Sequence, residues 1–251
     1  MTPSRALYKN PPLQEAVCEI HFPQDEQLDE PKIKLLQPVW KSQYEKQHII
    51  PEKTIEFNIG GAEGVRSNET TVGHRLVCKS VDGKDLAQLS STLLAVNRIS
   101  PYYGWDKFRE SILERWKELQ TTVGVRKFRH VGLRYINRID IPENPLTWEK
   151  WFELRLPIPK ISTMEPDSAQ MRFQTPIGEG RRLVTNIVTL KNTKDSAKTV
   201  VMLDNDMLWD GTPASPEQLS AVVEKLHDNL GIAFEAHLTN TLRALFQQEV
   251  R

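Results

Sequence analysis

The sequence has little of what disulfide scaffolds and zinc sites require. It contains only two cysteines in 251 residues, Cys18 and Cys78. Neither belongs to a CxxC pair or has a histidine at ligand spacing, so a disulfide framework and a zinc site are both excluded. Both cysteines fall inside apolar strand patterns. We therefore expect two buried, reduced thiols, no metal and no other cofactor.

Long hydrophobic runs and an excess of one charge are also missing. No stretch of about 18 apolar residues occurs, as a helical membrane span would need, and the first residues lack the apolar core of a secretory signal. Lysine plus arginine and aspartate plus glutamate both number 33, giving a formal net charge of zero. Dedicated nucleic-acid binders usually carry a basic excess. We expect a cytoplasmic protein with no membrane contact.

The motifs of common hydrolases and nucleotide-binding proteins are absent. No HExxH or GxSxG occurs, and the glycine-rich segment 58–69 lacks both the Gly-Lys-Ser/Thr and the following helix of a phosphate-binding loop. The segment 203–211 holds three aspartates without the glycine and distal glutamate of an EF-hand. We interpret these aspartates as turn chemistry at the end of a strand. The sequence thus gives no reason to expect catalysis.

What the sequence does contain is a regular series of amphipathic patterns. Period-two alternation predicts strands, and apolar spacings of three and four predict helices. In the first half these patterns give a strand at 16–22, a helix from 31, strands at 54–60, 74–80 and 85–99, and a helix at 105–120. In the second half they give a strand at 130–142, a helix at 144–156, strands at 169–177, 181–192 and 198–209, and a helical run from 215 onward.

The order of elements is the same in both halves. Matching elements lie about 110 residues apart, which suggests two copies of a β-α-β-β-β-α unit. An antiparallel sheet with helices on one side leaves its second face open. We predict an α+β fold in which the halves 1–123 and 124–251 form one compact pseudo-symmetric domain. Its core element would be an extended, curved antiparallel sheet with helices packed on one face.

The strand pattern LRYINRID, residues 133–140, carries charge on one face only. We expect its Leu/Tyr/Ile face to pack under the helices and its Arg/Arg/Asp face to lie on the open side. In the first strand, Glu19 and His21 fall on the corresponding face. Arginine forks suit phosphate and carboxylate groups, whereas a solvated or ion-paired surface is the alternative. The candidate ligand- or partner-binding residues are Glu19, His21, Arg134, Arg138 and Asp140.

Three stretches of the chain carry a resemblance to a known family. They are YKNPPLQEAVCEIHF at 8–22, HVGLRYINRIDIP at 130–142 and FEAHLTNTLRALF at 234–246. In these and in their order, the chain resembles a sporadically distributed bacterial family of proteins of about this length with no assigned function. The resemblance implies a bacterial, intracellular protein and a patchy distribution typical of mobile or defence-type gene cassettes. It brings no catalytic residues. Its most specific motif comprises Tyr8, Asn10, Pro11, Pro12, Glu15, Ala16, Val17, Glu19, Ile20 and Phe22.

Two functions follow as hypotheses. The first is a non-catalytic interaction or ligand-sensing subunit, such as one from a defence or stress cassette, whose partner is another protein or a second copy of the chain. Aromatic residues in loops and short helices, and a long apolar stripe past Gly231, suit such contacts. The alternative is a nucleic-acid binder that uses the open sheet face and the basic stretch 126–134. Its contact residues would be Arg126, Lys127, Arg129 and Arg134.

Overall fold

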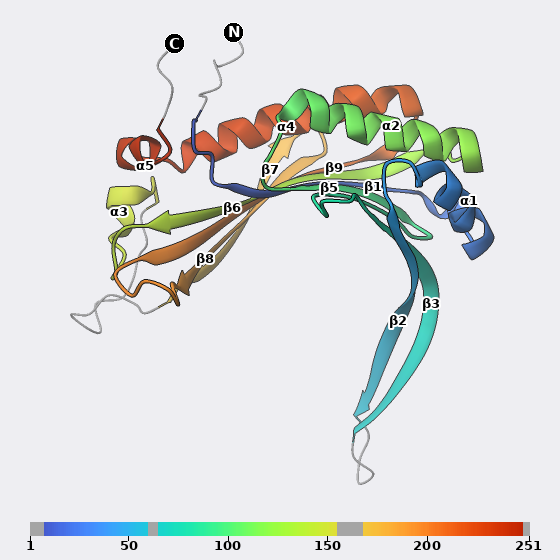
Figure 1. The fold of residues 1–251 in the computed structure, drawn as a ribbon, viewed down its shortest axis with the longest axis horizontal. Coiled ribbons are helices and arrows are strands. Elements are labelled where there is room, and N and C mark those ends of the chain that lie inside the picture. The colour runs from blue at the N-terminus through green and yellow to red at the C-terminus, as the bar shows by residue number, and fades with distance from the viewer. Residues whose placement is uncertain (1–7, 60–64, 155–167, 248–251) are drawn as a thin grey trace.

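The structure is built on a nine-stranded antiparallel sheet with helices on one side (Figure 1). The computed structural model describes residues 8–59, 65–154 and 168–247. The strands pair in the order β2-β3-β4-β5-β1-β6-β9-β8-β7. Their bounds are β1 Leu13–His21, β2 Lys46–Ile59, β3 Val65–Lys79, β4 Asp85–Leu89, β5 Leu93–Ile99, β6 Phe128–Ile141, β7 Gln170–Gly178, β8 Arg181–Lys191 and β9 Thr199–Ala214.

The long helices lie together on one face of this sheet, and the opposite face is open (Figure 1). The β2–β3 hairpin bends away from the helices and gives the sheet its arched outline. The helices are α1 Glu30–Trp40, α2 Trp105–Val123, α3 Trp148–Trp151, α4 Leu219–Ala236 and α5 Asn240–Leu245, with single 3-10 turns at Gln24–Glu26 and Pro216–Gln218. The predicted α+β class, the curved antiparallel sheet and the one-sided helix layer are confirmed.

The two halves meet at the centre of the sheet. β1 and β6, the first strand of each half, pair with each other. The second neighbour of β1 is β5, and the second neighbour of β6 is β9, so in each half the first strand adjoins the last. Among the described residues, the first half nevertheless has five strands and the second has four. The internal duplication and the division at residue 123 therefore stay predictions.

The prediction of one long strand at 85–99 is wrong, because this segment folds into β4 and β5. The Ser90 amide donates to the Leu93 carbonyl at 2.9 Å, and Leu89 pairs with Leu94 across the hairpin. A tight turn without glycine or proline joins the two strands. The turn residues Ser90, Ser91 and Thr92 interrupt the apolar pattern, and the core positions change phase from Leu89 to Leu94 across the turn.

The main core lies between the sheet and the three longest helices and contains residues of both halves. Cys18 and Ile20 of β1 and Leu133 of β6 are fully buried there, beneath Phe108 and Ile112 of α2. Cys18 and Cys78 are both buried and unpaired, and burial raises the pKa of the Cys78 thiol to about 12. The expectation of two inert, reduced thiols agrees with this environment.

A second, smaller core gathers at the far end of β6, β8 and β9. Trp148 and Trp151 of α3 are each 5% exposed within it, so they are core residues and not interface anchors. Leu238 and Leu242 are fully buried in the same cluster. The apolar residues Leu238 and Leu242 thus pack against the chain's own second core, whereas Ile232 of α4 is 53% exposed.

The final helical run breaks where the sequence gives a local reason for it. α4 continues through Gly231 and ends at Ala236. The Thr239 side chain then accepts a hydrogen bond from the Leu242 amide and caps α5. A threonine cap offers the backbone an alternative to continuing the helix. In the part of the chain that the structure describes, no helix is long and apolar enough to cross a membrane.

Candidate functional site

The open face of the sheet carries its charges along the central strands. On β6, Leu133 and Ile139 are buried, whereas Arg134, Arg138 and Asp140 are exposed, as the alternation predicted. The register sets the neighbours of this strand on both sides. β1 faces it with Val17↔Arg134, Glu19↔Gly132 and His21↔His130, and β9 faces it with Asp206↔Arg134, Leu208↔Gly132 and Asp210↔His130.

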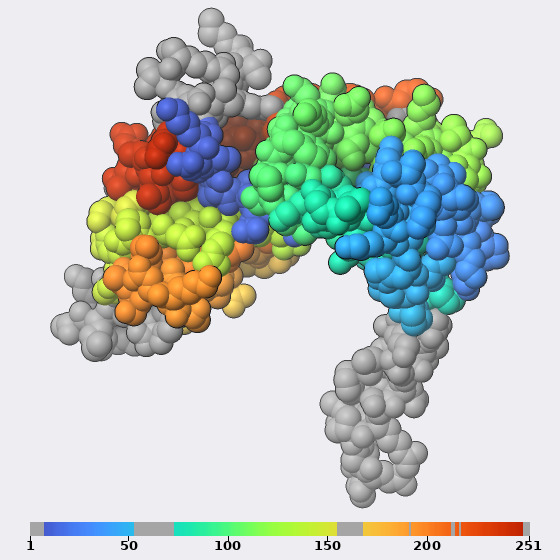
Figure 2. Space-filling model, in the orientation of Figure 1, coloured from blue at the N-terminus to red at the C-terminus, as the bar shows by residue number. Residues whose placement is uncertain are grey.

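This face is hollowed. Figure 2 shows the recess beneath the centre of the sheet, between the orange segment on one side and the blue segment on the other. The strands that run through its middle are β1, β6 and β9. A concave, one-sided sheet of this kind exposes side chains that the protein's own helices do not cover.

Arg134 is already engaged within the protein. Its Nε and Nη2 atoms donate to the two carboxylate oxygens of Asp204 at 2.8 and 2.6 Å, and this bond raises the pKa of Arg134. The Asn186 amide donates to the same carboxylate at 3.2 Å. Asp204 is only 8% exposed, so removing Arg134 leaves a buried charge without its main partner. Arg134 therefore has a structural role in addition to any contact with a ligand.

Arg138 and Asp140 lie apart from the other predicted site residues. Arg138 donates to Asp140 at 3.0 Å, and both side chains are more than 40% exposed. They come after Asn137, which is the last β6 residue paired with β1. Glu19 and His21 face the other end of that pairing and form an ion pair at 3.6 Å. The five predicted residues thus share one face but form two separate groups.

The centre of the face holds an unusual carboxylate, Asp206. Its Oδ1 atom lies over Gly132, where an added Cβ would be only 3.6 Å away. Burial raises the pKa of Asp206 to about 6; Arg134 opposes this shift, and the nearby carboxylates of Asp204 and Glu19 add to it. Among the residues that the structure describes, no cation lies within ion-pair distance of this carboxylate. The charges of Arg134 and Arg172 act on Asp206, but neither arginine forms an ion pair with it among the described residues.

The aspartates of β9 were misread from the sequence. Turn chemistry at a strand end is wrong for Asp204, Asp206 and Asp210, because β9 runs on to Ala214 and all three lie within it. Their even spacing places them on one face. The even spacing of the three aspartates is visible in the sequence. Their place on the open face depends on the pairing of β9 with β6, which no local pattern supplies.

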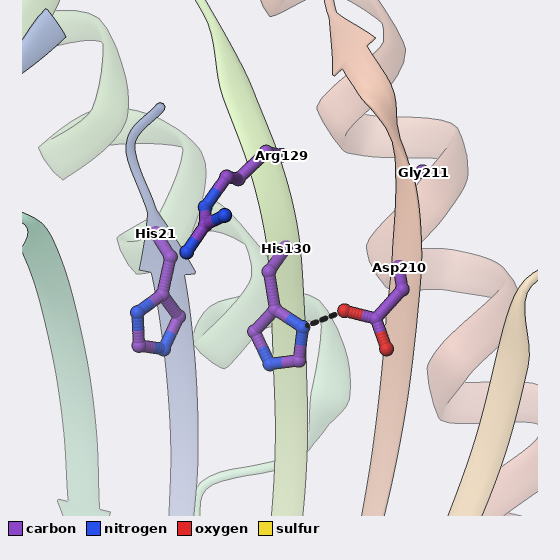
Figure 3. A pocket seen from close by; sticks show the side chains of 5 residues that line it. All are labelled: His21, Arg129, His130, Asp210 and Gly211. Atoms are coloured by element: carbon purple, nitrogen blue, oxygen red, sulfur yellow. Dashed lines mark hydrogen bonds and ion pairs between the residues drawn. The ribbon is translucent and has the colours of Figure 1, made fainter. Parts of the chain in front are cut away.

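A second cluster lies at one end of the open face (Figure 3). The Nδ1 atom of His130 is 2.6 Å from Oδ1 of Asp210, and Arg182 donates to the other oxygen at 3.1 Å. The rings of His21 and His130 make an edge contact with centroids 4.9 Å apart. Glu19 lies 3.6 Å from His21, and this contact lowers the pKa of Glu19. His21 has no histidine nearby in the sequence; its neighbour comes from the next strand.

The basic stretch 126–134 is partly neutralised by an acidic segment. Lys127 pairs with Asp25 at 2.7 Å, and the backbone amide of Arg126 donates to Glu26 at 3.0 Å. With Arg134 paired to a β9 carboxylate, the side chains of Arg126 and Arg129 are the two of this group to which no carboxylate pairs among the described residues. The predicted nucleic-acid contacts thus do not form one continuous basic surface.

The three stretches that carry the family resemblance come together in space. Tyr8 donates to Glu235 at 2.7 Å, and its ring contacts Phe234 and Phe246 edge to face. β1 and β6, which carry the other motif residues, are the central strand pair. These motif residues hold the N-terminal segment on the α4–α5 corner and build the middle of the sheet. Their observed contacts are structural.

The comparisons with known proteins add no relative. A scan against models of protein families found no match to the chain, and a search of curated proteins found no similar sequence. The resemblance described above therefore stays a prediction. Within the described ranges, no group of three histidine, cysteine, aspartate or glutamate side chains is placed to hold a metal ion.

Proposed function

We propose that this protein is a non-catalytic binding subunit that receives a charged segment of a partner protein on the open face of its sheet. The setting that the family resemblance implies is a bacterial intracellular system such as a defence or stress cassette. The partner is another protein or a second copy of the chain.

One observation carries the proposal: Asp206 is a partly buried carboxylate at the centre of the open face, and the described residues provide no ion-pair partner for it. An isolated charge in such a place costs stability. Local features that work against the fold are typical of functional sites. A lysine or arginine of a partner that pairs with Asp206 would remove this cost and would gain a charge-assisted hydrogen bond.

The paired charges around Asp206 support the same reading. Arg134 and Asp204 satisfy each other, and Glu19 pairs with His21. These pairs fix the side chains around the unsatisfied carboxylate, so a partner meets a surface that is already ordered. The basic residues of 126–134 have no comparable arrangement, and this favours a protein partner over nucleic acid.

The test is native mass spectrometry of the protein purified from its own host, together with two variants. Asp206→Asn removes the central charge with almost no change in shape. Asp106→Asn is the control, because it is the same substitution at an exposed aspartate on α2, away from the open face. We expect a partner on the wild type and on Asp106→Asn, and its loss on Asp206→Asn. A partner retained by Asp206→Asn, or bound nucleic acid released by high salt, would refute the proposal.

A further inference from the structure

The end of the open face contains a pocket of about 360 Å³ that is separate from the Asp206 centre. Three adjacent strands supply its lining: β1 ends there, β6 begins there and β9 passes by (Figure 3). The side chain of Arg129 extends from β6 toward His21 (Figure 3). The lining residues are His21, Arg129, His130, Asp210 and Gly211.

An irregularity in β9 shapes this pocket. The pairing of β6 with β9 shifts between Phe128↔Ala214 and His130↔Asp210, so β9 has extra residues at this point. Gly211 stands in the irregular segment, where a Cβ would lie 2.0 Å from the ring of Trp209. Only glycine fits there without moving the tryptophan. The strand therefore departs from its partner beside the two histidines, and bulges of this kind are common next to binding sites.

The hydrogen bonds orient the imidazoles. An ionised carboxylate only accepts hydrogen bonds, so we assign the proton between His130 and Asp210 to Nδ1 of the histidine. The Nε2 atom is then left for another group, and the ring is held in place by Asp210, which Arg182 also contacts. The side chains of His21 and His130 are 30% and 21% exposed, so both are within reach of a ligand.

The fixed charges of the pocket cancel one another. Arg129 and Arg182 contribute two positive charges, and Glu19 and Asp210 contribute two negative ones. β5 adds only Leu93, which pairs with His21 and carries no charge. Arg182 is held by Asp210, so the guanidinium of Arg129 is the positive charge that remains for a ligand.

We propose that this pocket binds the phosphate group of a small phosphorylated molecule through Arg129, His21 and His130. The guanidinium of Arg129, to which no carboxylate pairs in the described part of the chain, supplies a planar fork for two phosphate oxygens. The two imidazoles supply further donors. The volume suits a phosphate and a small organic group. The proposal rests on the proposed function in so far as it also treats the open face as a binding surface.

Isothermal titration calorimetry at neutral pH tests this site. The probes are inorganic phosphate, inorganic sulfate, adenosine monophosphate and a short single-stranded oligonucleotide. We expect both inorganic ions to bind. Adenosine monophosphate should bind more tightly than either inorganic ion.

Two variants assign the binding to these residues. Arg129→Gln and His130→Gln should each weaken sulfate binding about tenfold, and Lys107→Gln, at an exposed side chain on α2 away from the open face, should leave it unchanged. An unaffected Arg129→Gln variant, or no binding of any probe, would overturn the proposal. Preferential, strongly salt-dependent binding of the oligonucleotide would overturn the small-molecule assignment. If one of these overturning results is obtained and Asp206→Asn still loses the partner, the pocket proposal fails while the proposed function holds.

Discussion

Replacing Asp206 by asparagine should stabilise the protein, which is the reverse of what most substitutions do. Burial raises the pKa of Asp206 to about 6, against roughly 3.9 for an aspartate in an unfolded chain. Each pKa unit corresponds to about 1.4 kcal/mol, so the ionised carboxylate costs at most about 3 kcal/mol in the folded state. Asparagine has nearly the same shape and carries no charge. We expect a gain of about 2 kcal/mol in the free energy of unfolding at pH 8.

The sign of the pH dependence follows from the direction of this shift. Between pH 4 and 6 the folded protein holds a proton on Asp206 that the unfolded chain releases. The destabilising ionisation is therefore complete above pH 6 and disappears as the pH falls toward 4. The wild type should approach the stability of Asp206→Asn over this range. Urea denaturation of both proteins at pH 8.0, 6.0 and 4.5 measures the difference directly.

Asp140→Asn is the matched control. Asp140 is exposed on the same face and pairs only with a neighbour on its own strand, so its replacement should change stability by less than about 0.5 kcal/mol at each pH. An Asp206→Asn variant less stable than the wild type at pH 8.0 would refute the reasoning, because it would mean that the carboxylate has a stabilising partner. A stability gain that does not vary with pH would refute the assigned cause.

Three further predictions concern the fold and are checked by thermal and urea denaturation. Leu36→Ala should lower the free energy of unfolding by about 2–5 kcal/mol because Leu36 is fully buried. Leu35→Ala, at a side chain 52% exposed in the same helix, should lower it by less than about 0.5 kcal/mol. Equal losses would contradict the observed helix orientation. Arg134→Ala should lower the free energy of unfolding by about 1–2 kcal/mol; this figure is small because the arginine side chain is 45% exposed. Arg138→Ala should change it by close to zero, and the opposite order would refute the assigned pairing. Thr239→Ala should cost about 1 kcal/mol through loss of the α5 cap, and no loss would show that the packing of α5 makes the cap redundant.

Much of the fold could be predicted because most elements are amphipathic. The alternation through β6 assigned Leu133 and Arg134 to opposite faces, and the burial of the two residues agrees with it. Local patterns fail at 85–99, where a tight turn without glycine or proline separates two strands. They also fail in the final helical run, where the apolar stripe continues although α4 ends at Ala236 and Thr239 caps a new helix. Local patterns report which face is buried more reliably than where an element ends.

The candidate site could be predicted only in part, because its key contacts join strands far apart in the sequence. Glu19 and His21 were identified from one strand, but their neighbours depend on the register of β1 with β6. Asp206 and Asp210 enter the site through the pairing of β9 with β6. Register is a property of the whole sheet and is not encoded in any single strand.

The most direct test of the account is native mass spectrometry of the wild type and of Asp206→Asn, each purified from the host. If the open face is a binding surface, the wild type carries a partner that the variant lacks, although the variant is the more stable protein. This combination separates loss of binding from loss of folding. A partner that stays on a stabilised Asp206→Asn variant would contradict the central role given to this carboxylate and to the open face around it.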